Sequence, residues 1–565
     1  MKRAALLSAV LALASACTLP PPRPAKPSPS SDFRGVYFEK KRYSPVPLPR
    51  FEETRSLLPS PIADEHPLWV ETYWKAWELA FKNFHEPAWG SGFVSQFIDA
   101  AFNENIFLWD SCFMTMFCNY GHPFVPGIAT LDNFYAKQFV DGEIGREINR
   151  TTGVEYAPWI NFEKKPLFSR WGWGLSDEKA DRSVLYLGRR APRPNPRLTL
   201  DALDHPIFAW AELEHFRLSG DRLRLAAVWE PLVRYYRVLQ KYLRQGNGLY
   251  ITDWASMDNS PRNSYLNRGG TGIDISAEMV LFARDLAEIA RLIGRSGDEL
   301  GFRREADDLS LLINRFMWDG ERKFYYDLTV DGVRAPVKTV AAFWTMLAGV
   351  ASKEQARALA AELKNPATFG RRDPVPTCAA DEPEYDSRGG YWKGAVWAPT
   401  NTMVIRGLER YGFGDLAREI ALKHLDIVAE VYKRTGTIWE NYAPDAAEPG
   451  RHVTGELVKA DFVGWSGISP IMDLMEYGIG LKPDASSNTL EWRLNLHGRS
   501  GCDSYRFNNQ SASLLARVQG DGTAAITVIS GGEFDLRVIF QGWTETYKVK
   551  SGTNEFLLVT AGRKP

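Results

Sequence analysis

The sequence contains few cysteines, few histidines and almost no net charge. Five cysteines in 565 residues are too few for a disulfide-based scaffold. The eight histidines show no spacing to Cys or Glu that is typical of a metal site. With 68 basic and 69 acidic residues, the net charge is −1, which argues against a protein that binds nucleic acid by neutralising phosphates. We therefore expect no metal and no nucleic-acid partner.

Several other features are missing as well. There is no Walker loop, no dinucleotide fingerprint and no Gly-x-Ser-x-Gly elbow, so no cofactor is expected. Past the first residues, no segment approaches the roughly 18 continuous apolar residues of a membrane-spanning helix. A hydrophobic content of 44% and a charged content of 24% are typical of a packed globular protein. Aromatic residues are abundant at 13%, enough to fill a large core and to line a ligand cleft.

The first residues resemble a targeting signal rather than part of a fold. A positively charged start is followed by the apolar stretch 4–16 and then by Cys17. This pattern predicts a lipoprotein signal over residues 1–17, with lipidation at Cys17; ordinary signal cleavage is the alternative. The residue after it is Thr18, not the aspartate of inner-membrane lipoproteins, so we expect the outer membrane, on its periplasmic or cell-surface side. Residues 18–35 are rich in Pro and Ser and predict an extended tether.

The rest of the chain divides into a helical region and a β region. Apolar residues at three-to-four spacing predict helices over 67–84, 206–218, 222–242, 273–293, 298–318, 340–351, 353–363, 400–411, 415–432 and 465–477. Their pairing through short turns favours a closed ring of helical hairpins. After residue 481, alternating apolar residues and Gly turns predict a small antiparallel, β-sandwich-like module over 481–565. The long connections 141–205, 246–272, 364–399 and 433–464 are expected to carry function.

Two carboxylates stand out in those connections. Asp258 lies in the segment Met-Asp-Asn-Ser-Pro-Arg at 257–262, and Glu440 in Trp-Glu-Asn-Tyr at 439–442. Taken singly, Asp258 could cap a short helix, and a glutamate between aromatic residues could be a half-exposed surface residue. Taken together, two carboxylates on aromatic-rich loops are what glycosidic cleavage requires, one to protonate the leaving oxygen and one to attack or to activate water.

Five segments occur in an order that resembles a known family. They are Trp-Asp at 109–110, the segment 257–262, Tyr-Trp-Lys-Gly at 391–394 with Trp-Ala-Pro-Thr-Asn at 397–401, the segment 439–442, and Gly-Glu at 455–456 with Phe-Val-Gly-Trp-Ser at 462–466. This set resembles glycoside hydrolase family 63 and is also similar to the trehalases of family 37, over residues 65–480. The resemblance implies an (α/α)6-barrel catalytic domain, here over 36–480.

The same resemblance implies the chemistry. It predicts an inverting, exo-acting α-glycosidase, α-glucosidase or trehalase-like, that acts on an oligosaccharide, and we expect a monomer. Asp258 would be the general acid and Glu440 the general base, with the two carboxyl groups about 6.5–9.5 Å apart. Substrate binding is predicted for Trp109, Asp110, Asn133, Arg146, Arg262, Trp392, Lys393, Trp397, Asn401, Glu456 and Trp465.

The sequence departs from the family pattern at a few positions. Lys393 replaces the usual arginine, and a lysine cannot clamp two hydroxyls as a planar guanidinium does. Ser256 replaces a common glycine, and residues 33–66 are too few for the β domain that often precedes the barrel. Of the properties that the resemblance implies, the sugar and the linkage of the substrate are therefore the least determined.

Two alternatives remain open. One is a glycan-binding outer-membrane lipoprotein without catalysis, which would need the aromatic residues but not the two carboxylates in one pocket. The other is an (α/α)-barrel enzyme acting on a different bond, such as a β-glycosidase, a uronide-processing enzyme or a lyase. Lyases use Tyr or His as the base, and neither occurs in a distinctive motif here.

Overall fold

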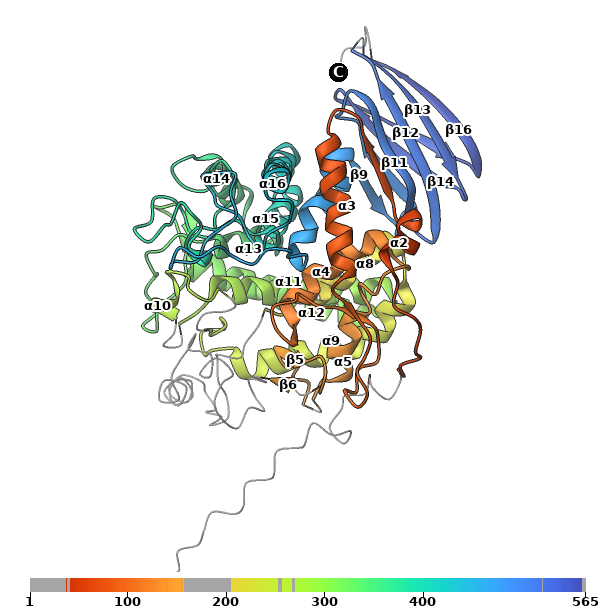
Figure 1. The fold of residues 1–565 in the computed structure, drawn as a ribbon. Helices are drawn as coiled ribbons and strands as arrows, with labels where there is room; N and C mark the ends of the chain where they lie inside the picture. Colours follow the sequence, from red (N-terminus) through yellow and green to blue (C-terminus); the bar gives the residue numbers. More distant parts are fainter. Residues whose placement is uncertain are drawn as a thin grey trace, which may run out of the picture.

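The structure is a computed structural model. It describes residues 37, 41–139, 141–153, 155–156, 205–252, 257–266, 270–520 and 522–560. A helix-rich domain is followed by a C-terminal β-sheet region (Figure 1), which confirms the predicted class of a mainly helical protein with a C-terminal β module. Cys17, the tether 18–35 and most of the connection 141–205 lie outside the described residues.

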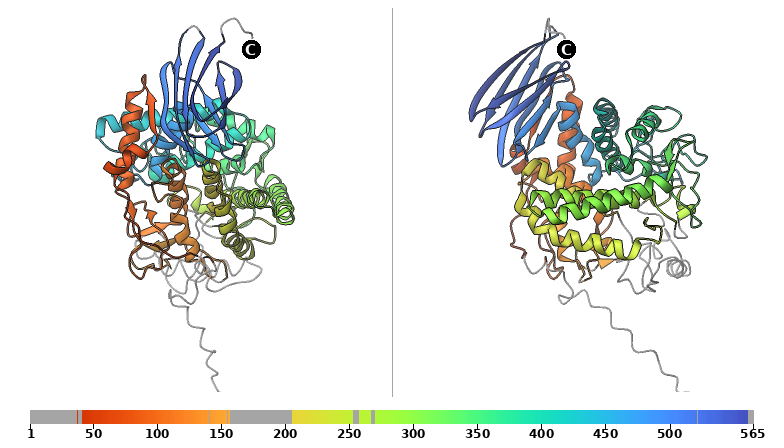
Figure 2. Two further views of the ribbon diagram at one scale, coloured as in Figure 1. Left: turned by 90° about the vertical axis from the view of Figure 1, so that its right-hand side faces the viewer. Right: turned by 180° about the vertical axis from the view of Figure 1, so that it is seen from behind.

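The long helices occur where the apolar spacing predicts them. They lie side by side in antiparallel pairs, of which α11 and α12 are the clearest example in the right-hand view of Figure 2. Local capping fixes several ends; Ser352 and Gln355, for example, form a reciprocal capping box at the start of α14. The main helices are α3 (Pro67–Phe81), α4 (Leu108–Cys118), α5 (Thr130–Ala136), α8 (Phe208–Ser219), α9 (Arg222–Leu243), α11 (Ile273–Leu292), α12 (Ser296–Phe316), α14 (Lys353–Lys364), α15 (Ala398–Arg410), α16 (Gly414–Thr435) and the π-helix η8 (Ile468–Ile479).

Shorter helical turns lie before and between these helices along the chain. They are α2 (Phe51–Thr54), η2 (Arg55–Leu57), η3 (Asn119–Gly121), α10 (Asn263–Leu266), η5 (Val340–Phe343), α13 (Trp344–Leu347), η6 (Tyr391–Lys393) and η7 (Trp465–Gly467). Small two- and three-residue strands pair into ribbons beside them: β2 (Phe84–His85) with β3 (Phe97–Ile98), β4 (Asn105–Phe107) with β5 (Glu147–Asn149) and β6 (Glu155–Tyr156), and β7 (Trp318–Asp319) with β8 (Phe324–Tyr325).

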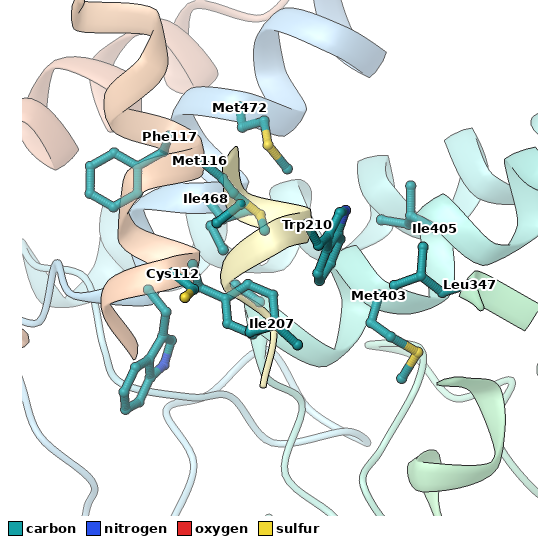
Figure 3. Packing of buried hydrophobic residues seen from close by; sticks show 14 of the residues in the cluster. Cys112, Met116, Phe117, Ile207, Trp210, Leu347, Met403, Ile405, Ile468 and Met472 are labelled. Atoms are coloured by element: carbon teal, nitrogen blue, oxygen red, sulfur yellow. The ribbon is translucent and has the colours of Figure 1, made fainter. Parts of the chain in front are cut away.

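A continuous apolar core lies between the helices. Figure 3 shows Met116 of α4 near Ile468 of η8, and Trp210 of α8 on the side of Met403 of α15. Burial of such side chains is the main favourable contribution to folding, about 1.5–3 kcal/mol for each large side chain. The described cysteines, Cys112, Cys118, Cys378 and Cys502, are buried and form no disulfide bond with one another. Among the described residues, no helix has both the length and the apolar character needed to cross a membrane.

Two sheets form the C-terminal module. One has the strand order β1-β11-β12-β13-β16 and the other β15-β14-β10-β9. Their bounds are β1 (Ser60–Ala63), β9 (Leu481–Asp484), β10 (Thr489–Arg493), β11 (Gly498–Phe507), β12 (Gln510–Val518), β13 (Thr523–Ser530), β14 (Phe534–Phe540), β15 (Trp543–Val549) and β16 (Gly552–Val559).

The module departs from the sequence prediction in two ways. It is not wholly antiparallel, because β10 and β14 pair in parallel. The chain passes through β11, β12 and β13 of the other sheet before it returns beside β10, and such a crossover allows the two strands to run the same way. In addition, β1 comes from near the start of the chain and pairs antiparallel with β11, with Ser60 opposite Asp503.

Candidate active site

One cavity of about 470 Å³ gathers most of the predicted site residues. It is bounded by the start of α4, the loop before α10, the turn η6 with the residue before α15, and the loop after α16. The fold thus brings together segments that are more than 300 positions apart in the sequence. The predicted residues that line the cavity are Asp258, Glu440, Trp109, Asp110, Arg146, Trp392, Trp397 and Trp465.

The loop that carries Asp258 is anchored by a buried arginine. Arg262 donates from Nε and Nη2 to Asp327 at 2.9 and 2.8 Å, and from Nη2 and Nη1 to Asp274. Asp274 and Asp327 also accept the backbone N–H groups of Ile275 and Ile273, at the start of α11. Because α11 is a long packed helix, this ion-pair cluster fixes the loop to a rigid element while Asp258 itself stays half-buried.

A side-chain amide connects this loop to the tryptophan wall. Asn259, next to Asp258, donates to the carbonyl of Gly390 at 2.9 Å and accepts the N–H of Trp392 at 2.8 Å. Asn263 also donates to the carbonyl of Met257 at 2.6 Å. These side-chain hydrogen bonds therefore set the position of Asp258 relative to Trp392.

Glu440 is more deeply buried than Asp258. Its side chain is 2% exposed, and burial raises its pKa to about 7. The N–H of Lys459, which donates to Oε2 at 3.2 Å, and the phenol of Tyr391 lower the pKa, whereas the nearby Asp258 carboxylate raises it. Oε1 is buried and has no hydrogen-bond partner among the described residues. This oxygen is placed to accept a proton from a water or from a substrate.

The backbone around Glu440 is held tightly. Its N–H donates to the carbonyl of Lys459 at 3.0 Å. Its carbonyl accepts the indole N–H of Trp465 at 2.9 Å and the hydroxyl of Ser466 at 3.1 Å. One of the wall tryptophans is therefore bonded directly to the residue that carries the carboxylate.

Indole rings form the wall of the cavity. Trp392 and Trp397 stack with their centroids 4.5 Å apart and an interplanar angle of 11°. Trp465 packs against Trp397 at 5.6 Å, and Trp109 lies 6.3 Å from Trp392 and 6.4 Å from Trp465. Flat apolar faces with carboxylates between them suit a sugar ring, which presents C–H groups on its faces and hydroxyls at its edge.

Sequence reasoning did not single out two polar residues that also line the cavity. Tyr391 has a left-handed backbone, with φ of +63°, which is uncommon for a residue with a side chain, and it places a phenol beside Glu440. Lys459 is half-buried in the lining, and its Nζ donates to the carbonyl of Ala101. Tyr391 was visible in a motif, but Lys459 has no sequence signal. The remaining lining residues are Phe102, Asn103, Phe107, His452, Leu457 and Val458.

Five predicted binding residues do not line the cavity. Arg262 is wholly buried in its ion-pair cluster. Asn133 is buried and bonds the backbone of Val94 and Ser95. Lys393 forms an ion pair with Glu384 at 2.5 Å. The other two are Asn401, buried in α15, and Glu456, exposed in a turn.

The described part of the chain contains no group of three or more His, Cys, Asp or Glu side chains that could hold a metal ion. The chemistry that can be derived from the cavity is that of its own side chains: three carboxylates, a phenol, an imidazole, an ammonium and a guanidinium, among aromatic rings.

Comparison with known proteins supports a glycosidase. Residues 189–463 match the family model described as the mannosylglycerate hydrolase MGH1-like glycoside hydrolase domain. An uncharacterized protein of Borreliella burgdorferi is 28% identical over 319 residues, covering 55% of this chain and 66% of that protein. Mannosylglycerate hydrolase MGH1 of Selaginella moellendorffii is 36% identical over 118 residues, covering 20% of this chain and 22% of that protein.

A solved structure shows the same fold. The family 63 mannosylglycerate hydrolase of Thermus thermophilus, in complex with glucose, aligns with a TM-score of 0.51 at 21% identity and covers 70% of this chain and 98% of that one. The matches to the two curated relatives span 66% and 22% of their lengths. The predicted resemblance is thus confirmed: the segment 189–463, which contains both Asp258 and Glu440, matches the MGH1-like glycoside hydrolase domain, and the chain shares its fold with a family 63 enzyme.

Proposed function

We propose that the protein is an inverting, exo-acting α-glycosidase, α-glucosidase or trehalase-like, whose helical domain is a six-hairpin (α/α) barrel and which acts as a monomer on small α-linked saccharides. The observation that carries this proposal is that Asp258 and Glu440 line one tryptophan-walled cavity and influence each other electrostatically. A glycan-binding protein without catalysis has no need of two carboxylates facing the same ligand.

The two carboxylates take different roles. Asp258 donates its proton to the glycosidic oxygen as the bond to the anomeric carbon breaks. Glu440, in its ionised form, removes a proton from a water that attacks the anomeric carbon from the opposite face, so that the product has the inverted configuration. Burial keeps the proton affinity of Glu440 high, which makes it a strong base once ionised.

The positively charged side chains in the cavity indicate which class of substrate the enzyme could bind. Arg146 and Lys459 add positive charge to the cavity, and this suits a leaving group with a carboxylate as well as a neutral sugar. Two of the similar proteins carry the name mannosylglycerate hydrolase. We therefore include α-glycosides of glycerate among the substrates to be tested, beside α-linked disaccharides.

The experiment is a turnover assay on that panel, with proton NMR of the first product. The expected result is hydrolysis with the inverted anomer formed first; initial retention would overturn the mechanism. Sugar binding without turnover of any substrate would instead favour the glycan-binding alternative, and turnover of β-linked substrates alone would favour a different linkage.

A change of leaving group separates the two roles. Fluoride leaves without being protonated, so the Asp258→Asn enzyme should retain substantial activity on an α-glycosyl fluoride while losing about 10²–10⁴-fold on a disaccharide. Glu440→Gln should lose activity on both, because water must still be activated. The reverse pattern would exchange the assignments of acid and base.

The N-terminal signal leads to a separate proposal about location. We propose that Cys17 is lipidated and anchors the protein at the outer membrane, supported by the sequence of residues 1–17 alone. Cell fractionation with mass spectrometry of the N-terminal peptide tests it. An acylated Cys17 in the membrane fraction, lost in Cys17→Ala, is expected; an unmodified N-terminus in the soluble fraction would disprove it.

A further inference from the structure

A second cavity, of about 190 Å³, lies where the helical domain meets the β module. The helical domain contributes Asn119 of η3, His122 directly after η3, and His215 of α8. The β module contributes Arg506 of β11. None of its lining residues belongs to the active-site cavity. Figure 1 shows α8 and β11 close to each other at this junction, and the two elements are in contact.

The helical side of the cavity holds a buried hydrogen-bond donor without an acceptor. His215 and Asn119 are 3% and 5% exposed, and Nδ1 of His215 lies 2.8 Å from Oδ1 of Asn119. With Oδ1 occupied in this way, Nδ2 of Asn119 is buried and has no partner among the described residues. Buried amide donors are almost always paired, so this one indicates a missing acceptor.

The β side holds a guanidinium without a counter-ion. Arg506 packs over the ring of Phe124, with its Cζ 4.7 Å from the ring centroid. None of the ion pairs among the described residues involves Arg506, and its Nε is buried without a hydrogen-bond partner in that part of the chain. No aspartate or glutamate is among the described residues that line this cavity. The donors on both sides are therefore unopposed by negative charge.

The described lining of the cavity carries one guanidinium, that of Arg506, and no carboxylate. Burial lowers the pKa of both His122 and His215, and the nearby Arg224 lowers them further; Asp221 acts in the opposite direction on His122. Two neutral imidazoles beside an unpaired arginine leave the site short of negative charge, and an anion supplies it.

We propose that this cavity is a binding site for a small phosphate- or carboxylate-bearing molecule, which accepts hydrogen bonds from Asn119 and Arg506 and thereby connects the two domains. Its volume is that of roughly six water molecules, which suits inorganic phosphate or a three-carbon acid rather than an oligosaccharide. A phosphate or carboxylate is the acceptor that an arginine binds most strongly.

The test is isothermal titration calorimetry of the full chain with inorganic phosphate and, separately, with acetate, in chloride buffer. We expect saturable binding of at least one of them in the millimolar range or tighter, weakened about tenfold or more in Arg506→Gln. Asn119→Asp, which replaces the donor by a negative charge in the same shape, should weaken it as well. Phosphate binding alone would identify the site as a phosphate site, and acetate binding alone as a carboxylate site.

Arg517→Gln is the matched control, because Arg517 is an exposed arginine on the neighbouring strand β12, and it should bind like the wild type. Thermal melting of each variant without ligand shows whether it is folded; if Arg506→Gln is not, Asn119→Asp carries the test. The proposal is overturned if neither anion binds the wild type, if both variants bind as the wild type does, or if glucose binds instead and loses affinity in Arg506→Gln.

Discussion

Arg262 and Asp274 form a bidentate ion pair in which neither side chain is exposed to solvent. A second carboxylate, Asp327, completes the cluster. Burial and the like charge of Asp274 raise the pKa of Asp327, whereas Arg262 lowers the pKa of Asp274. The cluster lies four positions from Asp258 and at the start of α11. It explains why an arginine in the most distinctive motif of the sequence does not reach the cavity.

The first prediction concerns this cluster. Arg262→Lys should lower the free energy of unfolding by about 3–5 kcal/mol, because a lysine cannot satisfy two buried carboxylates and leaves charge uncompensated. Urea unfolding measures the change. Arg237→Lys, which alters a half-exposed pair with Glu305, is the control and should change stability by less than about 1 kcal/mol. If Arg262→Lys changed the free energy of unfolding as little as Arg237→Lys does, Arg262 would not be the buried partner of both carboxylates.

The second prediction concerns pH and stability. The pKa of Glu440 is about 7 in the folded chain, against 4.5 for an unperturbed glutamate, so between these pH values the folded state binds more protons than the unfolded state. Stability from this group is therefore complete below pH 4.5 and falls as the pH rises through 7, by about 3 kcal/mol in all. The neutral Glu440→Gln protein avoids this loss.

Melting of wild type and Glu440→Gln as a function of pH measures this difference. The variant should be the more stable protein at pH 8, and the gap should close toward pH 4.5. A gap that stays constant across this range would contradict the raised pKa.

The third prediction concerns pH and rate. As a base, Glu440 must be ionised, so kcat/KM should rise with pH through a limb near pH 7. The Tyr391 phenol lowers the pKa of Glu440. Tyr391→Phe should therefore move that limb to higher pH while the fold is kept. A Tyr391→Phe profile that overlaps the wild type, or one that moves to lower pH, would show that the phenol does not act on this carboxylate.

The fourth prediction compares the hydrogen bonds that two indole N–H groups donate. Trp465 donates to the carbonyl of Glu440 at 2.9 Å, whereas Trp439 donates to the hydroxyl of Thr435 at 3.0 Å away from the cavity. Trp465→Phe should reduce kcat/KM by about tenfold or more, since a wall ring and a hydrogen bond at the catalytic residue are both changed. Trp439→Phe should leave kcat/KM within about twofold. Similar losses in both variants would rule out a specific role for the Trp465 bond.

The sequence predicted the helices well because their apolar faces repeat over several turns. The spacing over 273–293 matches α11 almost to the residue. The meeting of Asp258 and Glu440 in one cavity was also expected, because the short motifs that carry them resemble those of a known family. In both cases the information is carried locally, by periodicity or by an uncommon short segment.

What the sequence did not predict depends on contacts between distant residues. Arg262 resembles a ligand-binding residue until Asp274 and Asp327, 12 and 65 positions away, are seen around it. Glu456 is exposed in a short hairpin that is closed by the pairing of Arg451 with Leu457. The parallel pairing of β10 and β14 left no trace in the alternation of their residues, since strands of either direction show the same period of two.

Strand β1 has a consequence for how the chain is made and divided. Because residues 60–63 complete a sheet whose other strands begin at residue 498, the newly synthesised N-terminal segment has no partner until most of the polypeptide has left the ribosome. Removing the C-terminal module would expose the backbone edge of this early segment, and expressing the module alone would leave β11 with one unpaired edge. The two regions of this protein are thus tied together at the level of the backbone, and a cut near residue 480 separates strands that belong to one sheet.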